Sequence, residues 1–385
     1  MNRHHRQIIL PQIGEAGQQK LRDSHALIVG VGALGTVIAE SLLRGGVGTL
    51  TLVDRDVVEL TNLQRQTLYT EADAREAKPK ALAARDRLVQ IDSGADVRAV
   101  VEDFSSATAL EIASAPLSPG ERDGARASGS SCSPDAAPPS CSRSHPSPLP
   151  EGEGAGVSLL LDGTDNFETR YLLNDLSVSL GIPYVCAGAV ETGGTLMTVV
   201  PGGPCLRCVF PDIPAPGSEP TCDTAGVLGP AVGAVAHLSA AEAIKLLSDN
   251  ADDANQRLIQ LDAWAPSMRS VDLSNATNPD CPCCAHRRFD FLDGEVGEVT
   301  SLCGRRSVQI APAGRGVIEL NTLAERLSPY GDFEESNGAL RGAFSSETGE
   351  WGPITLHVFA TGRAIVGGTT DVAKAKSLYA RFIGG

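Results

Sequence analysis

The stretch from His25 to Asp54 constrains the fold more than any other part of this 385-residue chain. It begins with a short aliphatic run, HALIVG, which ends in glycine and is typical of a buried parallel strand. A helical pattern of apolar residues follows, and TLTLV at 49–53 predicts a second strand that Asp54 closes. A strand, a helix and a strand in this order predict a parallel sheet with helices against its faces.

The same alternation continues along the chain. Further strands are expected at 97–101, 158–161 and 183–187, and helices at 80–90, 167–180 and 229–247. An antiparallel pair is expected at 196–200 and 258–261. We therefore predict an α/β fold with a doubly wound, Rossmann-like, mostly parallel sheet. The apolar stretch 225–247 contains Pro230, Glu242 and Lys245, which favours a buried helix over a membrane span.

Residues 117–156 interrupt this pattern. Ser, Pro and Gly fill 22 of the 40 positions and no hydrophobic period is present, so a disordered insertion on a surface loop is predicted, with Cys132 and Cys141 as bystanders. The expected organisation is a domain at 1–290 that carries this insertion, followed by a small α+β accessory domain at 298–385. Strands at 308–311 and 354–359 and helices at 320–327 and 371–382 are expected in the second domain.

The net charge excludes some classes of partner. A formal charge of −15 is unfavourable for nucleic acid, because phosphate backbones are bound by clustered Lys and Arg. The N-terminal MNRHHRQIIL has basic residues but no apolar h-region, so no signal peptide is expected. We expect a cytoplasmic protein with no nucleic-acid or membrane partner. Ten cysteines in such a protein indicate a metal site or catalysis rather than disulfides.

Gly30, Gly32 and Gly35 form a G-x-G-x-x-G turn between the first strand and its helix. Glycines in this spacing let a phosphate approach the backbone N–H groups of a helix N-terminus. Asp54 ends the next strand, about where the acid that binds a ribose hydroxyl lies in dinucleotide-binding folds. These residues alone predict an NAD enzyme at least as strongly as an ATP enzyme, and a glycine turn without a ligand is a third reading.

Asn62, Arg65 and Lys80 follow closely behind Asp54, in VDRDVVELTNLQRQ and AKPK. Arg offers a planar fork for phosphate oxygens and Lys offers a point charge, and both neutralise charge that develops during phosphoryl transfer. Hydride transfer has no need of these groups. This set therefore favours a nucleoside triphosphate as the ligand.

Asp162 and Asp165 lie in LDGTDN, directly after the strand expected at 158–161. The carboxyl ends of strands are where the sites of α/β folds collect, and a carboxylate there can hold Mg²⁺ through its oxygen atoms. We expect this role for Asp165 rather than Asp162. Capping of the helix that follows is the alternative role, for Asp165 or for Asn166.

Two Cys-x-x-Cys pairs, Cys205 with Cys208 and Cys281 with Cys284, can place four thiolates around Zn²⁺. The long gap between the pairs indicates a structural clamp, and redox activity is the alternative. Cys283 lies inside the second pair, but the spacing favours Cys284 as the ligand.

Cys222 is a candidate nucleophile because it precedes a helix N-terminus, which lowers a thiol pKa. The alternative is that Cys222 is an unreactive loop cysteine. Cys186 and Cys303 are expected to have no chemical role.

Together these segments resemble the MoeB/ThiF/HesA family, the bacterial relatives of ubiquitin-activating enzymes. The resemblance covers about residues 3–290 apart from the insertion. It runs in order through RHHRQIILPQIGEAGQ, GVGALG, LVDRDVVELTNLQRQ, KPK, DGTDNFETRYLLND, CLRC, TCDTAGVLGP and CPCC. Each segment alone is a weak signal, and the ordered series is specific. One departure is Ala33 in place of a glycine of the family's G-x-G-G-L-G, which is tolerable where φ is negative.

The resemblance implies ATP and Mg²⁺ as ligands, usually in a homodimer. It implies that the glycine turn cradles the nucleotide, that Asp54 binds the ribose, and that Arg65 and Lys80 bind the phosphates in a pocket that Asn62 helps to form. It also implies that Mg²⁺ binds near Asp165 and its neighbour Asn166. Arg6 corresponds to an N-terminal arginine that reaches into the ATP site of the partner subunit. Cys222 corresponds to a loop cysteine that, in some members, bonds covalently to sulfur or to the carrier protein on which the enzyme acts.

The function implied by the resemblance is adenylation of the C-terminal Gly-Gly carboxylate of a small ubiquitin-like sulfur-carrier protein. A MoaD-like carrier is the first choice and a ThiS-like carrier the second, for molybdenum cofactor or thiamine biosynthesis. A separate sulfur donor, a sulfurtransferase or desulfurase, is expected because no rhodanese loop is recognisable. The alternatives are an NAD-dependent oxidoreductase and a non-catalytic carrier-binding protein. The chain itself ends in RFIGG, but a helix directly before Gly384 favours an accessory domain over a fused carrier.

Overall fold

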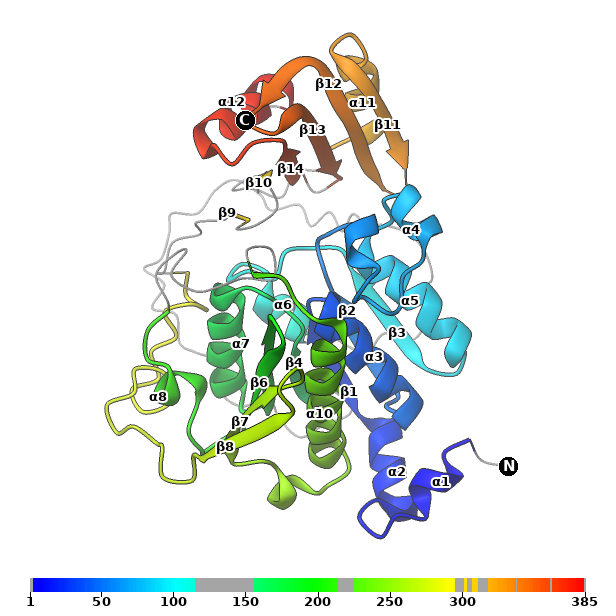
Figure 1. Ribbon diagram of the computed structural model, residues 1–385. Helices are drawn as coiled ribbons and strands as arrows, with labels where there is room; N and C mark the ends of the chain where they lie inside the picture. The colour runs from blue at the N-terminus through cyan, green and yellow to red at the C-terminus, as the bar shows by residue number, and fades with distance from the viewer. Residues whose placement is uncertain are drawn as a thin grey trace, which may run out of the picture.

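Two β-sheets organise the chain in the computed structural model, which describes residues 3–114, 156–213, 225–294, 301–302, 307–310, 318–336, 338–360 and 362–383. We call residues 3–294 the N-terminal unit and residues 301–383 the C-terminal unit. An eight-stranded sheet lies in the first and a six-stranded sheet in the second (Figure 1). The insertion expected at 117–156 lies outside the described residues except for Gly156, and so do Gly384 and Gly385.

The first sheet has the strand order β3-β2-β1-β4-β5-β6-β7-β8. The first five strands are parallel and the last three continue as antiparallel neighbours. The bounds are β1 His25–Val29, β2 Thr49–Val53, β3 Asp96–Val100, β4 Leu159–Asp162, β5 Tyr184–Val190, β6 Gly193–Val199, β7 Arg257–Asp262 and β8 Ser267–Asp272. The strand order reverses between β1 and β4, so the Rossmann-like arrangement is confirmed. The sheet is mixed, with four parallel and three antiparallel pairs of neighbouring strands.

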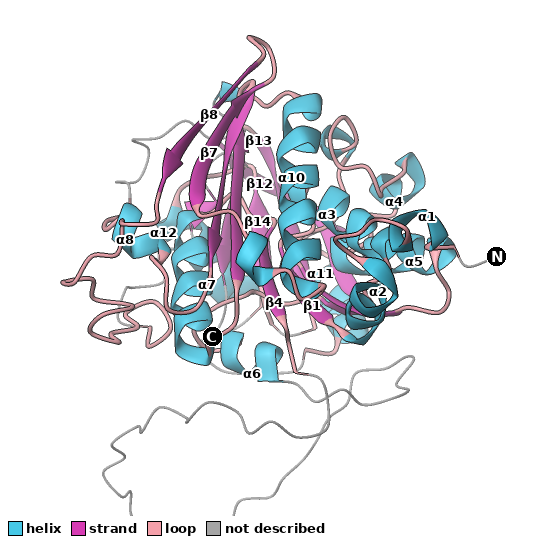
Figure 2. Cartoon of the chain, turned by 90° about the horizontal axis from the view of Figure 1, so that it is seen from below, coloured by secondary structure: helices cyan, strands magenta, loops and turns pink. Residues whose placement is uncertain are grey.

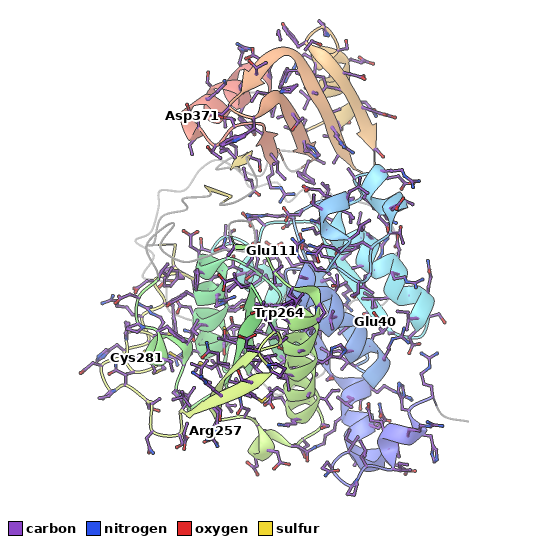
Figure 3. The ribbon with its side chains drawn as sticks, in the orientation of Figure 1. Glu40, Glu111, Arg257, Trp264, Cys281 and Asp371 are labelled. Atoms are coloured by element: carbon purple, nitrogen blue, oxygen red, sulfur yellow. The ribbon has the colours of Figure 1, made fainter. Side chains whose placement is uncertain are left out.

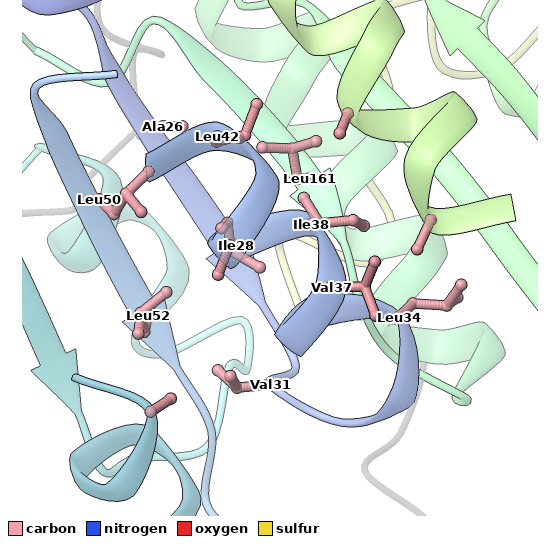
Figure 4. Close-up of a cluster of buried hydrophobic side chains, with 14 of the residues drawn as sticks. Ala26, Ile28, Val31, Leu34, Val37, Ile38, Leu42, Leu50, Leu52 and Leu161 are labelled. Atoms are coloured by element: carbon pink, nitrogen blue, oxygen red, sulfur yellow. The ribbon is translucent and has the colours of Figure 1, made fainter. Parts of the chain in front are cut away.

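Helices cover both faces of this sheet because successive residues of a strand point to opposite faces. Ala26 and Ile28 of β1 belong to the buried cluster that includes side chains of α3 (Ala33–Gly45) and α10 (Gly229–Leu247) (Figure 4). The intervening Leu27 and Val29 pack with α7 (Phe167–Leu180) and α6 (Ala109–Ser114) instead. Figure 2 shows the sheet between these two helical layers. All five residues of β1 are buried, as the aliphatic run predicts.

Among the described residues, α10 is the helix that is long and apolar enough to cross a membrane. Half of its most apolar window is buried inside the molecule, where the helix packs against α3, β5 and β6. Pro230 stands in its first turn, a position that needs no N–H donor within the helix. The expected buried helix at 229–247 is therefore confirmed as part of the core.

The remaining helices of the N-terminal unit are short or peripheral. They are α1 His5–Ile8, α2 Gly14–Asp23, α4 Glu71–Arg75, α5 Lys80–Ile91 and α8 Leu206–Val209, with 3₁₀ turns η1 Leu60–Asn62 and η2 Ala251–Asp253. The helices expected at 80–90 and 167–180 are confirmed as α5 and α7. The two N-terminal helices were not expected.

The C-terminal unit is an antiparallel sheet with two helices. The strand order is β11-β12-β13-β14-β10-β9, and the bounds are β9 Ser301–Leu302, β10 Ser307–Ile310, β11 Gly331–Ser336, β12 Ala339–Gly349, β13 Gly352–Phe359 and β14 Ala364–Gly367. Apolar side chains of α11 (Leu320–Leu327) and α12 (Val372–Phe382) share one buried cluster with the sheet. The expected helices and the strands at 308–311 and 354–359 are confirmed, whereas the other strands were not expected.

Candidate functional site

The glycine turn after β1 packs closely against the backbone of the turn after β4. Gly30 has a φ of 84°, and a Cβ on it would lie 2.7 Å from the carbonyl carbon of Gly163. A Cβ on Gly35 would lie 1.9 Å from the carbonyl oxygen of Gly30. Glycine is therefore required at both positions, since the backbones approach more closely than a side chain allows. The Gly163 N–H also donates to the Val29 carbonyl at 2.8 Å, so the turn lies where the strand order reverses.

Gly32, by contrast, is less tightly packed at the start of α3, where a Cβ would make only ordinary van der Waals contacts. A Cβ on Gly32 would meet nothing closer than 3.8 Å, the distance to the Gln66 amide nitrogen and the Gly163 carbonyl oxygen. Gly32 lies before the first N–H groups of α3, which have no partner within the helix and attract anions. Gln66 is buried, and its Oε1 has no hydrogen-bond partner among the described residues. The N–H groups at the start of α3 therefore suit a phosphate group, whereas the Gln66 Oε1 is an acceptor that would need a donor from the ligand or from water.

The substitution at Ala33 is compatible with this turn. Ala33 is the first residue of α3, and it is not among the described non-glycine residues with a positive φ. Its methyl group therefore causes no backbone strain.

Asp54 lies behind the glycine turn at the end of β2 and is buried. Its Oδ2 accepts a hydrogen bond from the Val31 N–H at 2.7 Å, and its Oδ1 accepts one from the Asp56 N–H at 2.8 Å. Burial raises the pKa of the Asp54 carboxyl, and the Lys80 ammonium opposes this effect. Asp54 is thus tied to the glycine turn, at the position expected for the residue that binds a ribose.

Lys80 is brought to Asp54 by the loop that follows β2. Lys80 is the first residue of α5, and its buried ammonium lies 3.2 Å from the Asp56 carboxylate. Tyr69 joins this group to the glycine turn, because its hydroxyl donates to the Val31 carbonyl at 2.5 Å and lies 3.2 Å from the Lys80 carbonyl. The structure therefore brings the glycine turn, Asp54 and Lys80 together.

Asn62 and Arg65 lie on the segment between Asp54 and Lys80. Asn62 is buried, and its side-chain oxygen accepts a hydrogen bond from the Glu59 N–H at 3.1 Å, so it shapes the η1 turn. Arg65 is half-buried, and its guanidinium donates to the Thr61 carbonyl at 3.0 Å. A Cβ on Gly229, at the start of α10, would lie 3.9 Å from the Arg65 Cβ. Arg65 thus stands beside the start of α10.

Asp162 is the centre of a buried polar network at the end of β4. Its Oδ2 accepts a hydrogen bond from the Arg170 Nε at 2.8 Å and one from the Tyr184 hydroxyl at 3.3 Å. Its Oδ1 accepts hydrogen bonds from the N–H and the hydroxyl of Thr164. Burial alone would lower the pKa of Arg170, but the Asp162 carboxylate raises it. Asp162 therefore holds the turn after β4 in shape.

Of the two residues considered as the cap of the helix after β4, Asn166 has that role. The Asn166 Oδ1 accepts hydrogen bonds from the Glu168 and Thr169 N–H groups at 2.8 and 3.4 Å, which makes Asn166 the N-cap of α7. Asp165, one residue earlier, is exposed. Since Asn166 serves as the cap, Asp165 does not have that role.

Arg6 lies far from this group within the same chain. It is exposed on α1, and the neighbouring Gln7 donates to the carbonyl of Gly45 at the last turn of α3. The glycine turn lies at the first residue of α3, and 13 helical residues separate the two ends by about 20 Å. One copy of the chain therefore does not bring Arg6 to its own glycine turn.

The four expected metal ligands meet in a single cluster. The Sγ atoms of Cys205, Cys208, Cys281 and Cys284 all lie within 4.8 Å of one another. Individual separations are 3.9 Å for Cys205 and Cys208, 3.6 Å for Cys205 and Cys281, and 3.3 Å for Cys208 and Cys284. A tetrahedral ion with metal–sulfur bonds of about 2.3 Å separates its sulfur atoms by about 3.8 Å. The cluster therefore fits such an ion.

Cys283 lies beside the cluster and also contacts α7. It is buried, and its Sγ accepts a hydrogen bond from the Asn174 side chain of α7 at 3.3 Å. Hydrogen bonding by Cys283 is the main cause that lowers the pKa of Cys205 to about 4, which favours the thiolate needed for metal binding. In Figure 3, Cys281 lies on the side of the N-terminal unit away from α4 and α5. This position is remote from Lys80 and agrees with a structural role.

The other cysteines add little to the site. Burial raises the pKa of Cys186 to about 12, so its thiol stays protonated, as expected of a core residue. Cys222 and Cys303 lie outside the described residues, as do Cys132 and Cys141.

Sequence reasoning missed five residues that shape the site: Asp56, Gln66, Tyr69, Gly163 and Arg170. All but Tyr69 lie inside a recognised segment, and Gln66 and Gly163 directly adjoin the selected Arg65 and Asp162. Gly163 had a usable signal, because a glycine that follows a strand end next to a glycine-rich turn indicates close backbone packing. The partners of Asp56 and Tyr69 depend on the folded loop and leave no such signal.

Comparison with known proteins identifies the family of the chain. The profile of the ThiF family matches residues 4–118 and 147–283. The chain is 36% identical over 384 residues to the sulfur carrier protein ThiS adenylyltransferase of Bacillus subtilis (strain 168), and the match covers 99% of each chain. It is 37% identical over 290 residues to the Escherichia coli (strain K12) protein of the same name, covering 75% of this chain and 96% of that one.

Two further proteins extend the comparison. The adenylyltransferase and sulfurtransferase MOCS3 of Sus scrofa is 32% identical over 336 residues, which cover 85% of this chain and 64% of that protein. The solved structure of E. coli MccB with MccA-N7isoASN has a TM-score of 0.55 at 20% identity over 74% of each chain, which shows a shared fold. The profile match and the full-length relative establish that this chain belongs to the ThiF family and is an adenylyltransferase.

Proposed function

We propose that the chain uses ATP and Mg²⁺ to adenylate the C-terminal Gly-Gly carboxylate of a small ubiquitin-like sulfur-carrier protein. The observation that carries this proposal is the meeting of the glycine turn, Asp54 and Lys80 at the carboxyl edge of the parallel strands. Relatives named as sulfur-carrier adenylyltransferases support the choice of substrate.

The nucleotide would enter with its phosphates at the start of α3. Gly32 leaves room there for phosphate oxygens to reach backbone N–H groups. Asp54 would accept hydrogen bonds from the ribose hydroxyls. Lys80 and Arg65 would neutralise the phosphates, and Asp165 would hold Mg²⁺ through its exposed carboxylate. Asn62 would act by shaping the η1 turn that carries Arg65.

In the reaction, a carboxylate oxygen of the carrier's terminal glycine attacks the α-phosphorus of ATP. The bond between the α-phosphorus and the bridging oxygen breaks, and pyrophosphate leaves with that electron pair. The product is a carrier acyl-adenylate, from which a sulfur nucleophile later displaces AMP. Both reactants are anions, so the residues contribute mainly by positioning them and by offsetting their repulsion.

A ThiS-like carrier is the better-supported substrate. The full-length relative named for ThiS matches 99% of this chain, and therefore includes the C-terminal unit. The sequence had placed a MoaD-like carrier first, and that carrier becomes the competing substrate in the test. A separate sulfurtransferase or desulfurase would supply the sulfur, and Cys222 would receive the sulfur or the carrier covalently.

The active assembly would be a cytoplasmic homodimer. Arg6 is about one α3 length away from its own glycine turn, so it would act in the site of the partner subunit. Zn²⁺ would be held by Cys205, Cys208, Cys281 and Cys284. In that role the metal binds the 205–209 segment to the 281–284 turn and takes no part in adenylation.

ATP–pyrophosphate exchange tests the function directly. Purified full-length chain, ATP, Mg²⁺ and labelled pyrophosphate are incubated with a ThiS-like carrier, a MoaD-like carrier or no carrier. Exchange that requires a carrier with an intact Gly-Gly end, and is faster with the ThiS-like protein, is the expected result. Carriers that lack the two glycines serve as the control. Exchange independent of any carrier, or none at all, contradicts the proposal.

A further inference from the structure

The C-terminal unit reaches the nucleotide site through the hairpin that joins β13 to β14. Arg363 lies in this hairpin and is buried, and its Nη2 donates a hydrogen bond to the backbone carbonyl of Arg55. Its guanidinium also stacks on the Phe359 ring, 3.8 Å from the ring centroid. Arg55 directly follows Asp54 in the chain, so this contact touches the loop that shapes the site.

The loop held by Arg363 carries the groups that organise the site. Asp56, the next residue after Arg55, donates its N–H to Asp54 and binds the Lys80 ammonium through its carboxylate. The Asp56 carbonyl also accepts the Lys80 N–H at 2.8 Å. A shift of the Arg55 carbonyl would therefore move the partners of both Asp54 and Lys80.

Apolar contacts fix the same hairpin on the two segments that meet at Lys80. Val57 and Ala77 of the N-terminal unit form one buried cluster with Ala339 and Phe359 of the C-terminal unit. Val57 pairs with Pro79 in an isolated antiparallel bridge, next to Lys80. The hairpin thus rests on both sides of the junction that places the lysine.

A second set of polar contacts holds the side chain of Arg55. The Arg55 guanidinium lies 2.8 Å from the Asp103 carboxylate, whose other oxygen accepts a hydrogen bond from Gln309 of β10 at 3.3 Å. The C-terminal unit therefore contacts Arg55 directly at its carbonyl and indirectly at its side chain.

The charge of Arg363 suits this position. Burial lowers the pKa of its guanidinium to about 10, and the Asp56 carboxylate opposes this effect, so the group stays protonated at neutral pH. Its Nη1 has no hydrogen-bond partner among the described residues. An unpaired buried donor costs free energy, and the nearby Asp56 and Asp103 carboxylates offset part of the cost of burying the charge.

We propose that Arg363 is a positioning residue of the adenylation site: it holds the Arg55–Asp56 turn so that Asp54 and Lys80 keep the spacing that ATP requires. The identity of the nucleotide rests on the proposed function. Arg363 itself does not touch the reacting atoms. Its contribution is transmitted through one backbone carbonyl.

The test compares two arginines of the C-terminal unit in the full-length chain. Arg363→Met removes the contact with the turn. Arg326→Met is the matched control, because Arg326 binds the Phe382 and Ile383 carbonyls at 2.8 and 3.0 Å and does so within the C-terminal unit. The Kd for ATP is measured by equilibrium dialysis, and the KM values for ATP and carrier by pyrophosphate exchange. Thermal melting of both variants reports on folding.

We expect the Kd and KM for ATP to rise about tenfold in Arg363→Met, the effect of losing one hydrogen bond to a charged group. The KM for the carrier should stay unchanged, and Arg326→Met should bind ATP as the wild type does. Arg363→Lys retains the charge and one donor and should recover part of the affinity. In a double-mutant cycle, Arg363→Met and Asp56→Asn should be less than additive, because both act through the same turn.

An unchanged Kd for ATP in a folded Arg363→Met variant would overturn the proposal. Equal losses in Arg363→Met and Arg326→Met would overturn it too, because they would reflect general loosening of the C-terminal unit. If Arg363→Met fails to fold, Arg363→Lys and a cycle of Arg363→Lys with Asp56→Asn decide. Wild-type chain that binds ATP but shows no carrier-dependent exchange would contradict the proposed function, while the dialysis comparison would still decide the role of Arg363.

Discussion

The Lys80 ammonium lies 3.2 Å from the Asp56 carboxylate, and the same two residues share a backbone hydrogen bond of 2.8 Å. The lysine side chain is only 3% exposed, so this ion pair fixes it before any nucleotide arrives. A cation that is already positioned needs no reorganisation when charge develops on a phosphate. The pair also prevents the ammonium from being buried without a partner when the site is empty.

Lys80→Met should lower carrier-dependent exchange by about 10²-fold or more, the scale of losing one charge-stabilising donor. Lys78→Met is the control, because Lys78 lies two residues away and pairs with Asp86 at 2.7 Å on the other side of the segment. We expect that variant to retain wild-type exchange. Initial rates at saturating carrier provide the measurement, and near-normal rates for Lys80→Met would show that the phosphates bind elsewhere.

Arg65→Ala should also lower exchange by about 10²-fold while the fold is kept. The Arg65 guanidinium contacts the Thr61 carbonyl near the surface, so little stability depends on it. Far-UV circular dichroism and thermal melting check the fold, and pyrophosphate exchange checks the activity. A folded variant with full activity would remove Arg65 from the phosphate-binding set.

Asp165 and Asp162 should respond to replacement in opposite ways. Asp165→Asn changes an exposed carboxylate, so we expect lost adenylation, a raised Mg²⁺ requirement and an unchanged melting temperature. Asp162→Ala removes the buried partner of the partly buried Arg170 and should lower the free energy of unfolding by about 3 kcal/mol. Denaturant unfolding and Mg²⁺ titration of exchange separate the two. Full activity in Asp165→Asn would assign the metal to another residue.

The residues of the site that could be predicted are those with a local signal. The positions of Gly30, Gly35 and Asp54 in the site could be predicted from their spacing around two strands, because a few consecutive residues determine the geometry of a tight turn. The network around Asp162 and the Lys80–Asp56 pair could not be predicted, since they depend on how loops close. The contact of Arg363 with Arg55 joins residues 308 positions apart, and no periodicity encodes such a contact.

The fold shows the same division. Buried strands such as β1 were found because four of its five residues are aliphatic and all five are buried. β8 was missed because all six of its residues are exposed, and its composition therefore lacks the alternation that marks a strand. β11 has four exposed residues of six and was missed for the same reason.

Metal analysis should find about one zinc ion per chain in reduced protein. Cys205→Ser, Cys281→Ser and Cys284→Ser should each release the ion and lower the melting temperature, because each removes one of four ligands. Cys283→Ser is the control, since its thiol contacts Asn174, and it should retain the ion. Retention in Cys284→Ser together with loss in Cys283→Ser would reverse the assignment.

His357 should make the C-terminal unit sensitive to acid. Burial, and then the charge of Arg341 on the paired strand, lowers the pKa of His357 from 6.5 to about 4. Between these values the unfolded chain binds more protons than the folded chain, so the free energy of unfolding falls as the pH falls through this window. The loss has an upper limit of about 3 kcal/mol.

His357→Gln should abolish this pH dependence, and Arg341→Met should weaken it because one cause of the lowered pKa is gone. Urea unfolding at several pH values measures it. A Trp264→Phe background leaves Trp351 as the single tryptophan, so its fluorescence follows the C-terminal unit alone. Equal slopes with pH for His357→Gln and the parent would contradict the prediction.

The two pairs of the cysteine cluster also set an order of events during synthesis. Cys205 and Cys208 leave the ribosome first, and the residues they meet, Cys281 and Cys284, are each 76 positions later. The intervening chain contains α10, which packs on α3 in the core. Nascent chains shorter than this therefore carry an open pair of thiols and an incomplete core. The four-thiol cluster can therefore close only after most of the N-terminal unit has been synthesised.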